Sequence, residues 1–244
     1  GELSQYLYRP KGLTAVIAPW NFPLAISCGM SAAALVAGNC VLFKPSGLSL
    51  RVGWGLAELF REAGLPEGVF TYLPGRGSVM GDALVGHKDI SAIAFTGSVE
   101  TGLRIIQKAA APAPGQDHVK KVVAEMGGKN AIIVDDDAEL DEAVAGVLYS
   151  AFGFQGQKCS ACSRVIVLDA VYDTFVRRLV AAADSLKLGP AEDPANAMGP
   201  VVDKAAKKSI MQYVELAGQE GKILLTKMPA SAEDDSCWAP LTIV

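Results

Sequence analysis

The sequence predicts an α/β protein built around a largely parallel β-sheet. Short apolar segments alternate with helical segments along the first half of the chain, a pattern typical of βαβ units with right-handed crossovers. Residues 12–43 carry no charged side chain, which indicates elements buried on both sides. The chain has 244 residues, of which 50% are hydrophobic. Since a typical domain holds roughly 100–200 residues, this length indicates one large domain or two smaller ones.

The elements follow one another regularly before Gly127. We expect strands at residues 14–18, 40–43, 69–73, 90–95 and 120–124. Helices are expected at residues 24–36, 48–63, 79–85 and 99–111. The second helix is amphipathic and is followed by Gly64 and then Pro66, the usual order of residues at a helix end.

The pattern restarts after Gly127 and Gly128. Strands are expected at residues 131–134 and 165–168, and helices at residues 140–151, 171–186 and 205–217. We therefore predict a domain boundary near Gly127, with parts of two domains at residues 12–127 and 128–244.

Composition excludes several classes of protein. A net charge of −4 and a pI of 5.3 disfavour nucleic-acid binding, which needs a basic excess. The uncharged stretch at residues 12–43 is interrupted by Pro19, Asn21, Pro23 and Asn39, whereas a membrane span needs about 20 uninterrupted apolar residues. The five cysteines are scattered and odd in number, which predicts a reducing cytoplasm rather than a disulfide framework.

Two glycine-containing turns follow predicted strands and enter predicted helices. One contains Gly75, Gly77 and Gly81, and the other contains Gly97 and Ser98. Such turns can present backbone N–H groups to a phosphate. The alternatives are a plain strand–helix turn at the first and ordinary N-capping by Ser98 at the second. Two such turns in one parallel sheet favour a nucleotide site.

Cys159 has three possible interpretations. It could be a nucleophile aided by the cation of Lys158, one half of a Cys-x-x-Cys pair with Cys162, or a packed thiol. A zinc site would need further ligands, and the only histidines are His87 and His118. We therefore predict no metal.

Glu125 and Asn21 are two further polar side chains in apolar surroundings. Glu125 ends a predicted strand and precedes two glycines. It could act as a general base with a raised pKa in a cleft, or form a surface ion pair. Asn21 lies between two prolines. It could cap the following helix, or donate a hydrogen bond to a developing oxyanion.

Taken together, six segments resemble the aldehyde dehydrogenase superfamily. They occur in that family's order and at its spacings, from residue 12 to about residue 200. The segments are PWNFP at 19–23, KPS at 44–46, GLPEGV at 64–69, FTGS at 95–98, EMGGK at 125–129 and GQKC at 156–159. Residues 153–164 are most similar to glutamate-γ-semialdehyde (1-pyrroline-5-carboxylate) dehydrogenases, including the dehydrogenase half of bifunctional proline-utilisation proteins.

The resemblance implies a Rossmann-like cofactor domain, part of an α/β catalytic domain, and three catalytic residues. Cys159 would be the nucleophile that forms a thiohemiacetal and then a thioester. Asn21 would meet the oxyanion together with the Cys159 backbone N–H, and Glu125 would activate water as the general base.

The resemblance also implies binding residues for NAD, with NADP as the alternative, and for a small aldehyde. Lys44 would reach the adenine-side ribose and Ser98 the pyrophosphate. The cofactor site is assigned to Lys44, Ser98, Gly97, Trp20, Pro45, Gly77 and Gly127. Phe22 and Ser160 would contact the substrate's aliphatic chain and carboxylate.

The sequence departs from the family pattern in two ways. Gly47 stands where many NAD-preferring members have a glutamate, which bears on the choice between NAD and NADP. Segments that would bind the nicotinamide ribose and anchor the substrate carboxylate lie outside the chain. We therefore expect a fragment that is inactive alone. By the same comparison, residues 1–11 would end a bridging strand used to form a homo-oligomer.

Overall fold

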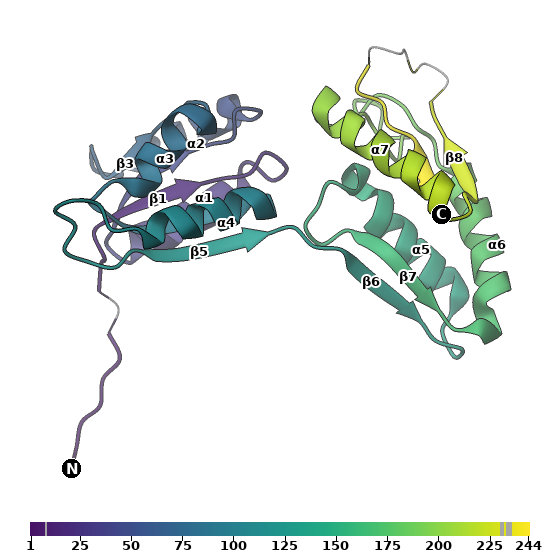
Figure 1. Ribbon diagram of the computed structural model, residues 1–244, viewed down its shortest axis with the longest axis horizontal. Helices are drawn as coiled ribbons and strands as arrows, with labels where there is room; N and C mark the ends of the chain where they lie inside the picture. Colours follow the sequence, from purple (N-terminus) through teal and green to yellow (C-terminus); the bar gives the residue numbers. More distant parts are fainter. Residues whose placement is uncertain (8, 230–231, 233–235) are drawn as a thin grey trace. The chain divides into compact units, whose positions relative to one another are not determined.

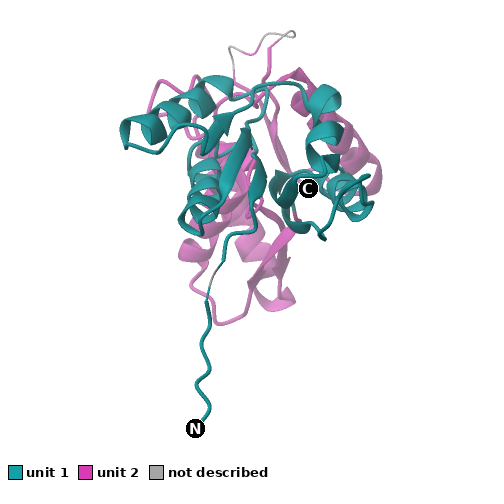
Figure 2. Ribbon diagram, turned by 90° about the vertical axis from the view of Figure 1, so that its left-hand side faces the viewer, with its two compact units in different colours: residues 1–127 teal, residues 128–244 magenta. Residues whose placement is uncertain are grey.

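The computed structural model describes residues 1–7, 9–229, 232 and 236–244. The chain divides into two compact units, Gly1–Gly127 and Gly128–Val244. Figure 2 colours the two units separately. Among the described residues the first unit has one sheet and the second has two, and each unit has its own buried apolar clusters.

The first unit is a five-stranded sheet in which every pair of neighbouring strands is parallel. Its strands lie in the order β3-β2-β1-β4-β5. Their bounds are β1 Leu13–Ile17, β2 Cys40–Lys44, β3 Phe70–Tyr72, β4 Ile90–Gly97 and β5 Lys121–Met126. The strand order reverses at β1, which is paired with both β2 and β4. In an open α/β sheet, ligands bind at the carboxyl ends of the strands beside such a reversal.

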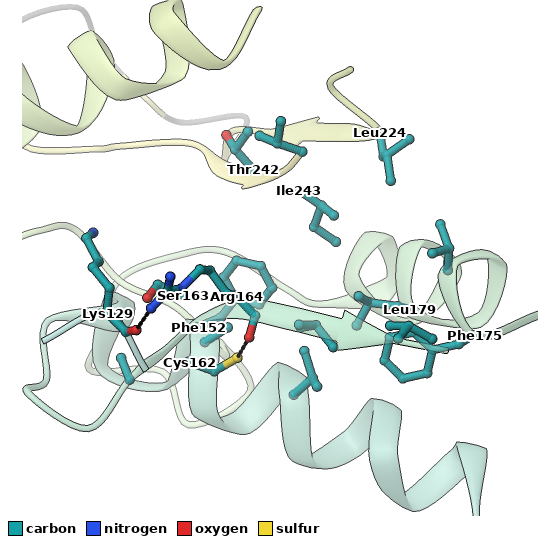
Figure 3. A pocket seen from close by; sticks show the side chains of 18 of the residues that line it. Lys129, Phe152, Cys162, Ser163, Arg164, Phe175, Leu179, Leu224, Thr242 and Ile243 are labelled. Carbon is teal, nitrogen blue, oxygen red and sulfur yellow. Dashed lines mark hydrogen bonds between the residues drawn. The ribbon is translucent and has the colours of Figure 1, made fainter. Parts of the chain in front are cut away.

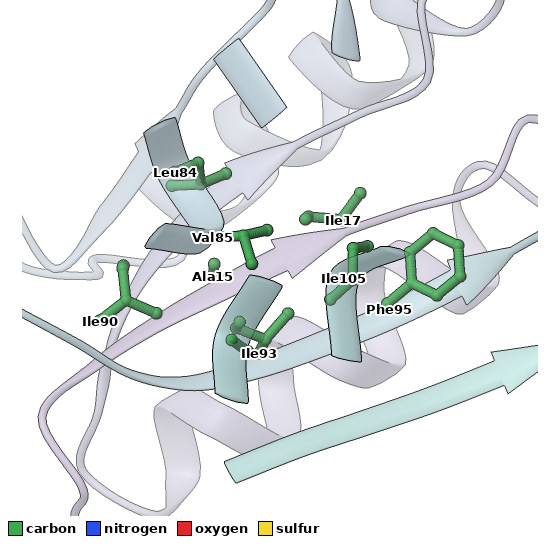
Figure 4. Packing of buried hydrophobic residues seen from close by; sticks show 9 residues of the cluster. Ala15, Ile17, Leu84, Val85, Ile90, Ile93, Phe95 and Ile105 are labelled. Carbon is green, nitrogen blue, oxygen red and sulfur yellow. The ribbon is translucent and has the colours of Figure 1, made fainter. Parts of the chain in front are cut away.

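Four helices connect these strands (Figure 1). They are α1 Ala25–Val36, α2 Leu50–Glu62, α3 Gly77–Gly86 and α4 Val99–Ala110. Alternate residues of β1 face different clusters. Ala15 and Ile17 pack with residues of α3 and α4 (Figure 4), whereas Val16 and Ala18 pack with residues of α1 and α2. Both faces of β1 are therefore buried, as the uncharged stretch predicted.

The buried polar side chain of Asn39 is satisfied within this unit. Its amide Nδ2 donates to Ala34 O at 2.9 Å, and its Oδ1 accepts from the backbone N atoms of Lys11 and Gly12 at 2.6 and 3.0 Å. Asn39 thus fixes the start of β1 against the end of α1.

Among the described residues, no helix combines the length and apolar character that crossing a membrane would require.

The second unit begins with a parallel pair of strands. These are β6 Asn130–Val134 and β7 Cys162–Val167, and the helices α5 Leu140–Phe152 and α6 Asp169–Ser185 pack on them. The register shifts between Asn130 and Ala131, where Cys162 and Arg164 are the opposing partners. Ser163 is therefore the extra residue of a β-bulge, a feature often found beside active sites.

The described part of this unit contains four further elements, one before β7 and three after α6. A short 3₁₀ helix, η1 Gly153–Gly156, precedes β7, and the later elements are α7 Lys204–Glu220, β8 Leu225–Lys227 and β9 Leu241–Ile243. Strands β8 and β9 form an antiparallel ribbon.

The predicted strands and helices all occur, with small differences at their ends. The largest differences are three residues: α7 ends at Glu220 rather than at residue 217, and β7 begins at Cys162 rather than at residue 165, because pairing with β6 extends it through polar residues. The element η1 and the ribbon of β8 and β9 were not predicted. Residues 1–7 and 9–11 form no strand within a single chain.

Candidate active site

The predicted residues of the first unit lie along one edge of its sheet. Lys44 ends β2, Gly97 ends β4, and Glu125 is the penultimate residue of β5. Asn21 follows β1 in the connection to α1. Because the strands are parallel, these four residues all lie at or beyond the carboxyl ends.

A cavity of about 280 Å³ lies near this edge, between the sheet and helices α3 and α4. Two of the predicted cofactor residues line it, Lys44 and Gly77, and the Lys44 Cε lies 3.9 Å from where a Gly77 Cβ would stand. The Lys44 Nζ donates to Pro45 O at 3.0 Å. Burial lowers the pKa of the Lys44 ammonium from its ordinary value. A cation thus stands beside the open start of α3.

The far wall of this cavity carries further polar groups. Arg104 and Asp82 form an ion pair of 2.7 Å between α4 and α3, and Ser78 and Lys108 also line the cavity. An adenosine-sized group could hydrogen-bond to these side chains while its ring packs on the apolar wall, which includes Ile105.

Ser98 caps α4. Its Oγ accepts a hydrogen bond from Thr101 N at 3.3 Å. The interpretation of Ser98 as an ordinary N-cap is therefore correct, and a phosphate role would have to coexist with it. Gly97 is tightly enclosed, since a Cβ there would lie 2.6 Å from the Phe95 ring. Neither Ser98 nor Gly97 is among the residues that line the cavity.

Asn21 does not cap α1 as an N-cap residue. Leu24 occupies that position without a side-chain capping bond, and the Asn21 Oδ1 accepts from Phe22 N at 3.1 Å. The next residue, Phe22, is 37% exposed. Trp20 is half-buried and Pro45 is buried, and neither lines the cavity.

Glu125 and Gly127 stand at the end of the first unit. Both residues are exposed, and Glu125 is paired in register with Thr96 of β4. Among the described residues Glu125 forms no ion pair, so the surface ion pair, one of its two interpretations, is not observed.

In the second unit, Cys159 is exposed on a turn between η1 and β7. The Ala161 N donates to Lys158 O at 3.2 Å and closes this turn. The side-chain amide of Asn130 donates to the carbonyl oxygens of Cys159 and Ala161 at 2.7 and 3.1 Å. Ser150 Oγ accepts from Cys162 N at 3.1 Å. The main chain around Cys159 is therefore anchored by two side chains, those of Asn130 and Ser150.

The segment before Cys159 has an uncommon backbone. Phe154 and Gln155 both have φ of +57°, and Gly156 has φ of +67°. Non-glycine residues rarely adopt this region, and they do so mostly where the surrounding structure enforces it, often at functional sites. The Gln157 Oε1 accepts from Val202 N at 3.0 Å and ties this segment to the stretch before α7.

Three residues adjacent to Cys159 in the sequence differ in their exposure and contacts. Ser160 is exposed. The Lys158 ammonium lies 5.2 Å from the centroid of the Tyr149 ring, in cation–π range. Cys162 is buried, and its thiol donates to Arg164 O at 3.3 Å. Cys159 is the accessible thiol of the two, so the packed-thiol interpretation of Cys159 is not supported, whereas Cys162 is packed.

A larger cavity, of about 580 Å³, lies in the second unit between β7 and the ribbon of β8 and β9. Figure 3 shows Cys162 and Arg164 on one side of it and Thr242 and Ile243 on the other. Cys159 does not line it.

Within the described ranges, three potential metal-binding groups gather only at the exposed acidic turn of residues 135–137.

Sequence reasoning missed the anchoring residues Asn130, Ser150 and Gln157. Asn130 directly follows the EMGGK segment and Gln157 lies within GQKC, so both were adjacent to recognised motifs. Their roles depend on contacts 29 and 45 residues apart in the chain, which no local pattern reveals.

The fold and these residues define a class of protein. A family model described as "Aldehyde dehydrogenase family" matches residues 1–244, and the chain belongs to that family.

Similar proteins point to one branch of the family. The chain is 49% identical over 224 residues to 1-pyrroline-5-carboxylate dehydrogenase of Anoxybacillus flavithermus, and 47% identical to that of Bacillus subtilis. Each match covers 92% of this chain and 44% of the relative. The chain thus spans less than half the length of these relatives.

Solved structures agree with this placement. Proline utilization A from Bdellovibrio bacteriovorus superposes with a TM-score of 0.93 at 55% identity, covering 97% of this chain and 24% of that one. A 1-pyrroline-5-carboxylate dehydrogenase from Thermus with bound NAD superposes with a TM-score of 0.91 at 40% identity, covering 99% and 48%.

Proposed function

We propose that this chain supplies the nucleophile, the general base and the adenosine side of the cofactor site of an NAD-dependent aldehyde dehydrogenase. Its substrate would be glutamate γ-semialdehyde and its product glutamate. The observation that carries the proposal is the exposed Cys159, held on an anchored turn in a chain that matches the family along its whole length. The names of the relatives support the substrate.

Covalent attack begins the reaction. The Cys159 thiolate adds to the aldehyde carbon, and the carbonyl oxygen becomes an oxyanion. The side-chain amide of Asn21 and the Cys159 N–H would donate hydrogen bonds to it. Such donors stabilise the charge that develops in the transition state more than the ground-state aldehyde.

Oxidation and hydrolysis complete the reaction. NAD, when bound, would supply the acceptor for the hydride that the carbon attached to Cys159 loses, so this carbon would remain on the sulfur as a thioester. Glu125 takes a proton from water, the resulting hydroxide attacks the thioester, and the carboxylate product leaves as the Cys159 thiolate is released.

The first unit offers groups that fit a dinucleotide. The cavity beside Lys44 and Gly77 has room for the adenine-side portion, and the Lys44 ammonium can donate to ribose hydroxyls. Gly97 ends β4 and Ser98 is the N-cap of α4, whose N-terminal N–H groups suit a phosphate. Trp20, Pro45 and Gly127 complete the assignment. The open space at Gly47 keeps NADP as the alternative.

Two residues would recognise the substrate. Phe22 is a partly exposed ring one residue from Asn21, and it would pack on the aliphatic chain. Ser160 is adjacent to the nucleophile, and its hydroxyl would donate to the α-carboxylate. We further propose a homo-oligomer and a reducing, cytoplasmic location. The free state of all five cysteines supports that location.

The test uses the complete gene product and measures reduction of the nicotinamide by absorbance. Glutamate γ-semialdehyde is compared with an aliphatic aldehyde of equal length that lacks the α-carboxylate and amino group. We expect Cys159→Ala to lower kcat by several orders of magnitude. The matched control, Cys40→Ala, removes another exposed thiol and should leave kcat unchanged.

The outcomes separate the alternatives. Preference for the semialdehyde supports the proposal, and indifference to the carboxylate indicates a family member with a different substrate. An active enzyme in which Cys159→Ala keeps its rate would refute the nucleophile. Absence of any aldehyde oxidation would indicate a module that has kept only the fold.

A further inference from the structure

Asn130 lies at the first position of β6 and reaches across to the turn that carries Cys159. Its single amide group donates to two carbonyl oxygens, those of Cys159 at 2.7 Å and Ala161 at 3.1 Å. An amide nitrogen carries two hydrogens, so both are engaged by the main chain of this one turn. None of the roles assigned above uses Asn130.

These two bonds restrict the backbone at the nucleophile. The direction of a residue's carbonyl is set by its ψ angle, so a donor fixed opposite Cys159 O holds ψ of Cys159. The second bond, to Ala161 O, holds the other end of the turn. The Cys159 N–H, the proposed oxyanion donor, shares a peptide plane with Lys158 O, which accepts from Ala161 N at 3.2 Å in the same turn, so the turn restrains that N–H as well.

Asn130 is itself held in place from both directions. Its carbonyl oxygen accepts from the Ser163 hydroxyl at 3.4 Å. The preceding Lys129 carbonyl accepts from the Arg164 guanidinium. Asn130 also starts β6, opposite Cys162 in register. The donor that restrains the turn therefore stands on a strand rather than on a mobile loop, which favours precise positioning.

The chemistry of the contact requires a donor of this shape. Aspartate would place carboxylate oxygens against two carbonyl oxygens, and alanine would leave both carbonyls to water. Serine would keep one donor on a shorter side chain. We therefore expect the effects of these three substitutions to be graded.

We propose that Asn130 is the positioning residue for the nucleophile, holding the turn of residues 158–161 so that the Cys159 thiolate and backbone N–H address the same carbonyl group. This inference rests on the proposed role of Cys159, and it adds a residue that acts through the turn rather than by touching substrate.

The experiment uses the 244-residue chain and needs no aldehyde oxidation. Hydrogen exchange measured by mass spectrometry follows the amides of Ala161 and Cys162. Two reagents then probe Cys159. Iodoacetamide needs only an accessible thiolate, whereas p-nitrophenyl acetate forms an acyl-enzyme through an oxyanion and releases a coloured phenolate. Cys159→Ala provides the background rate for both reagents.

Asn130→Ala and Asn130→Asp should raise exchange of the two amides by about tenfold, since a hydrogen bond of ordinary strength is lost. Acylation should fall by about tenfold to a hundredfold, because small misplacement of a nucleophile is costly. Alkylation should stay within about threefold. Asn130→Ser should lie between these variants and the unaltered chain, and it serves if the other two fail to fold.

The control is Asn196→Asp, because the Asn196 amide also donates to a backbone carbonyl of the second unit, that of Pro190 at 2.9 Å. In the Asn196 variant, the exchange of the Ala161 and Cys162 amides and the rates with both reagents should be unchanged. The inference is overturned if Asn130 variants exchange like the Asn196 variant, or if acylation falls no more than alkylation. Failure of the proposed function would instead appear as a complete gene product that oxidises no aldehyde while these differences persist.

Discussion

Replacing Gly156 with alanine should destabilise the second unit. Gly156 has φ of +67°, and a Cβ there would lie 2.8 Å from the backbone oxygen of Ala151. The left-handed region costs an alanine about 1–2 kcal/mol. The contact forces a shift of the main chain, because backbone cannot rotate away as a side chain can, and crowding of this kind adds roughly 1 kcal/mol or more.

Part of that cost is offset in the unfolded chain. Alanine has fewer unfolded conformations than glycine, which favours folding by about 0.4–1 kcal/mol. The net expectation is a loss of about 2 kcal/mol in the free energy of unfolding, or roughly a 30-fold change in the folded-to-unfolded ratio. The displaced segment lies three residues before Cys159, so alkylation of that thiol should change as well.

The assay must report on the second unit alone, because two units with separate cores need not unfold together. Native-state hydrogen exchange of the α6 amides around Phe175 and Leu179, which are 1% and 6% exposed, provides that report. Two controls separate the causes. Gly64→Ala, at φ of +83° with no atom within 4 Å, tests the backbone angle alone in the first unit, and Gly146→Ala lies open on α5.

We expect Gly64→Ala to cost less than Gly156→Ala, and Gly146→Ala to stabilise α5 by up to about 1 kcal/mol. An unchanged exchange rate in Gly156→Ala would refute the reasoning. If Gly156→Ala costs no more stability than Gly64→Ala, the close contact with Ala151 O contributes nothing to the destabilisation.

Three further changes test other parts of the structure. Ser98→Ala removes the cap of α4 and should lower the free energy of unfolding of the first unit by about 1 kcal/mol in urea denaturation, and an unchanged value would contradict the role of the cap. Phe175→Ala should cost the second unit about 3–5 kcal/mol, and a cost below 1 kcal/mol in the α6 exchange assay would contradict the packing. Bonds to the Ile90 carbonyl and to Asp117 raise the pKa of His118. The contribution of protonated His118 to the stability of the first unit should therefore be complete below the ordinary histidine pKa, near 6.5. It should be lost as the pH rises through the raised pKa of His118. His118→Gln should abolish that loss in a pH series of melting temperatures, and an unaltered pH profile would refute it.

Much of the first unit was predictable because its signals are local. Alternating apolar segments placed the strands and helices, and parallel strands then required Lys44, Gly97 and Glu125 to share one edge of the sheet. The Ser98 cap also follows from its position before a helix. Cys159 was recognisable through the GQKC segment, although spacing alone left packing and redox interpretations open.

The surroundings of Cys159 were not predictable in the same way. Phe154 and Gln155 have no intrinsic preference for positive φ, so their conformation reflects the structure around them rather than their residue types. The early start of β7 depends on pairing with β6, since strand formation follows context more than propensity. The Asn130 bonds join segments 29 and 31 residues apart.

If Lys44 contacts the dinucleotide as proposed, its buried position would couple nucleotide binding to proton uptake. Its ammonium loses a proton more readily than an ordinary lysine because burial disfavours the charge. A ligand that brings negative charge or ribose hydroxyls to this ammonium favours the protonated form, so binding should be accompanied by net proton uptake once the pH approaches the lowered pKa. Affinity for a dinucleotide would then decline with rising pH earlier than an exposed lysine would allow, and calorimetric titrations in buffers of different ionisation enthalpy would measure the proton directly.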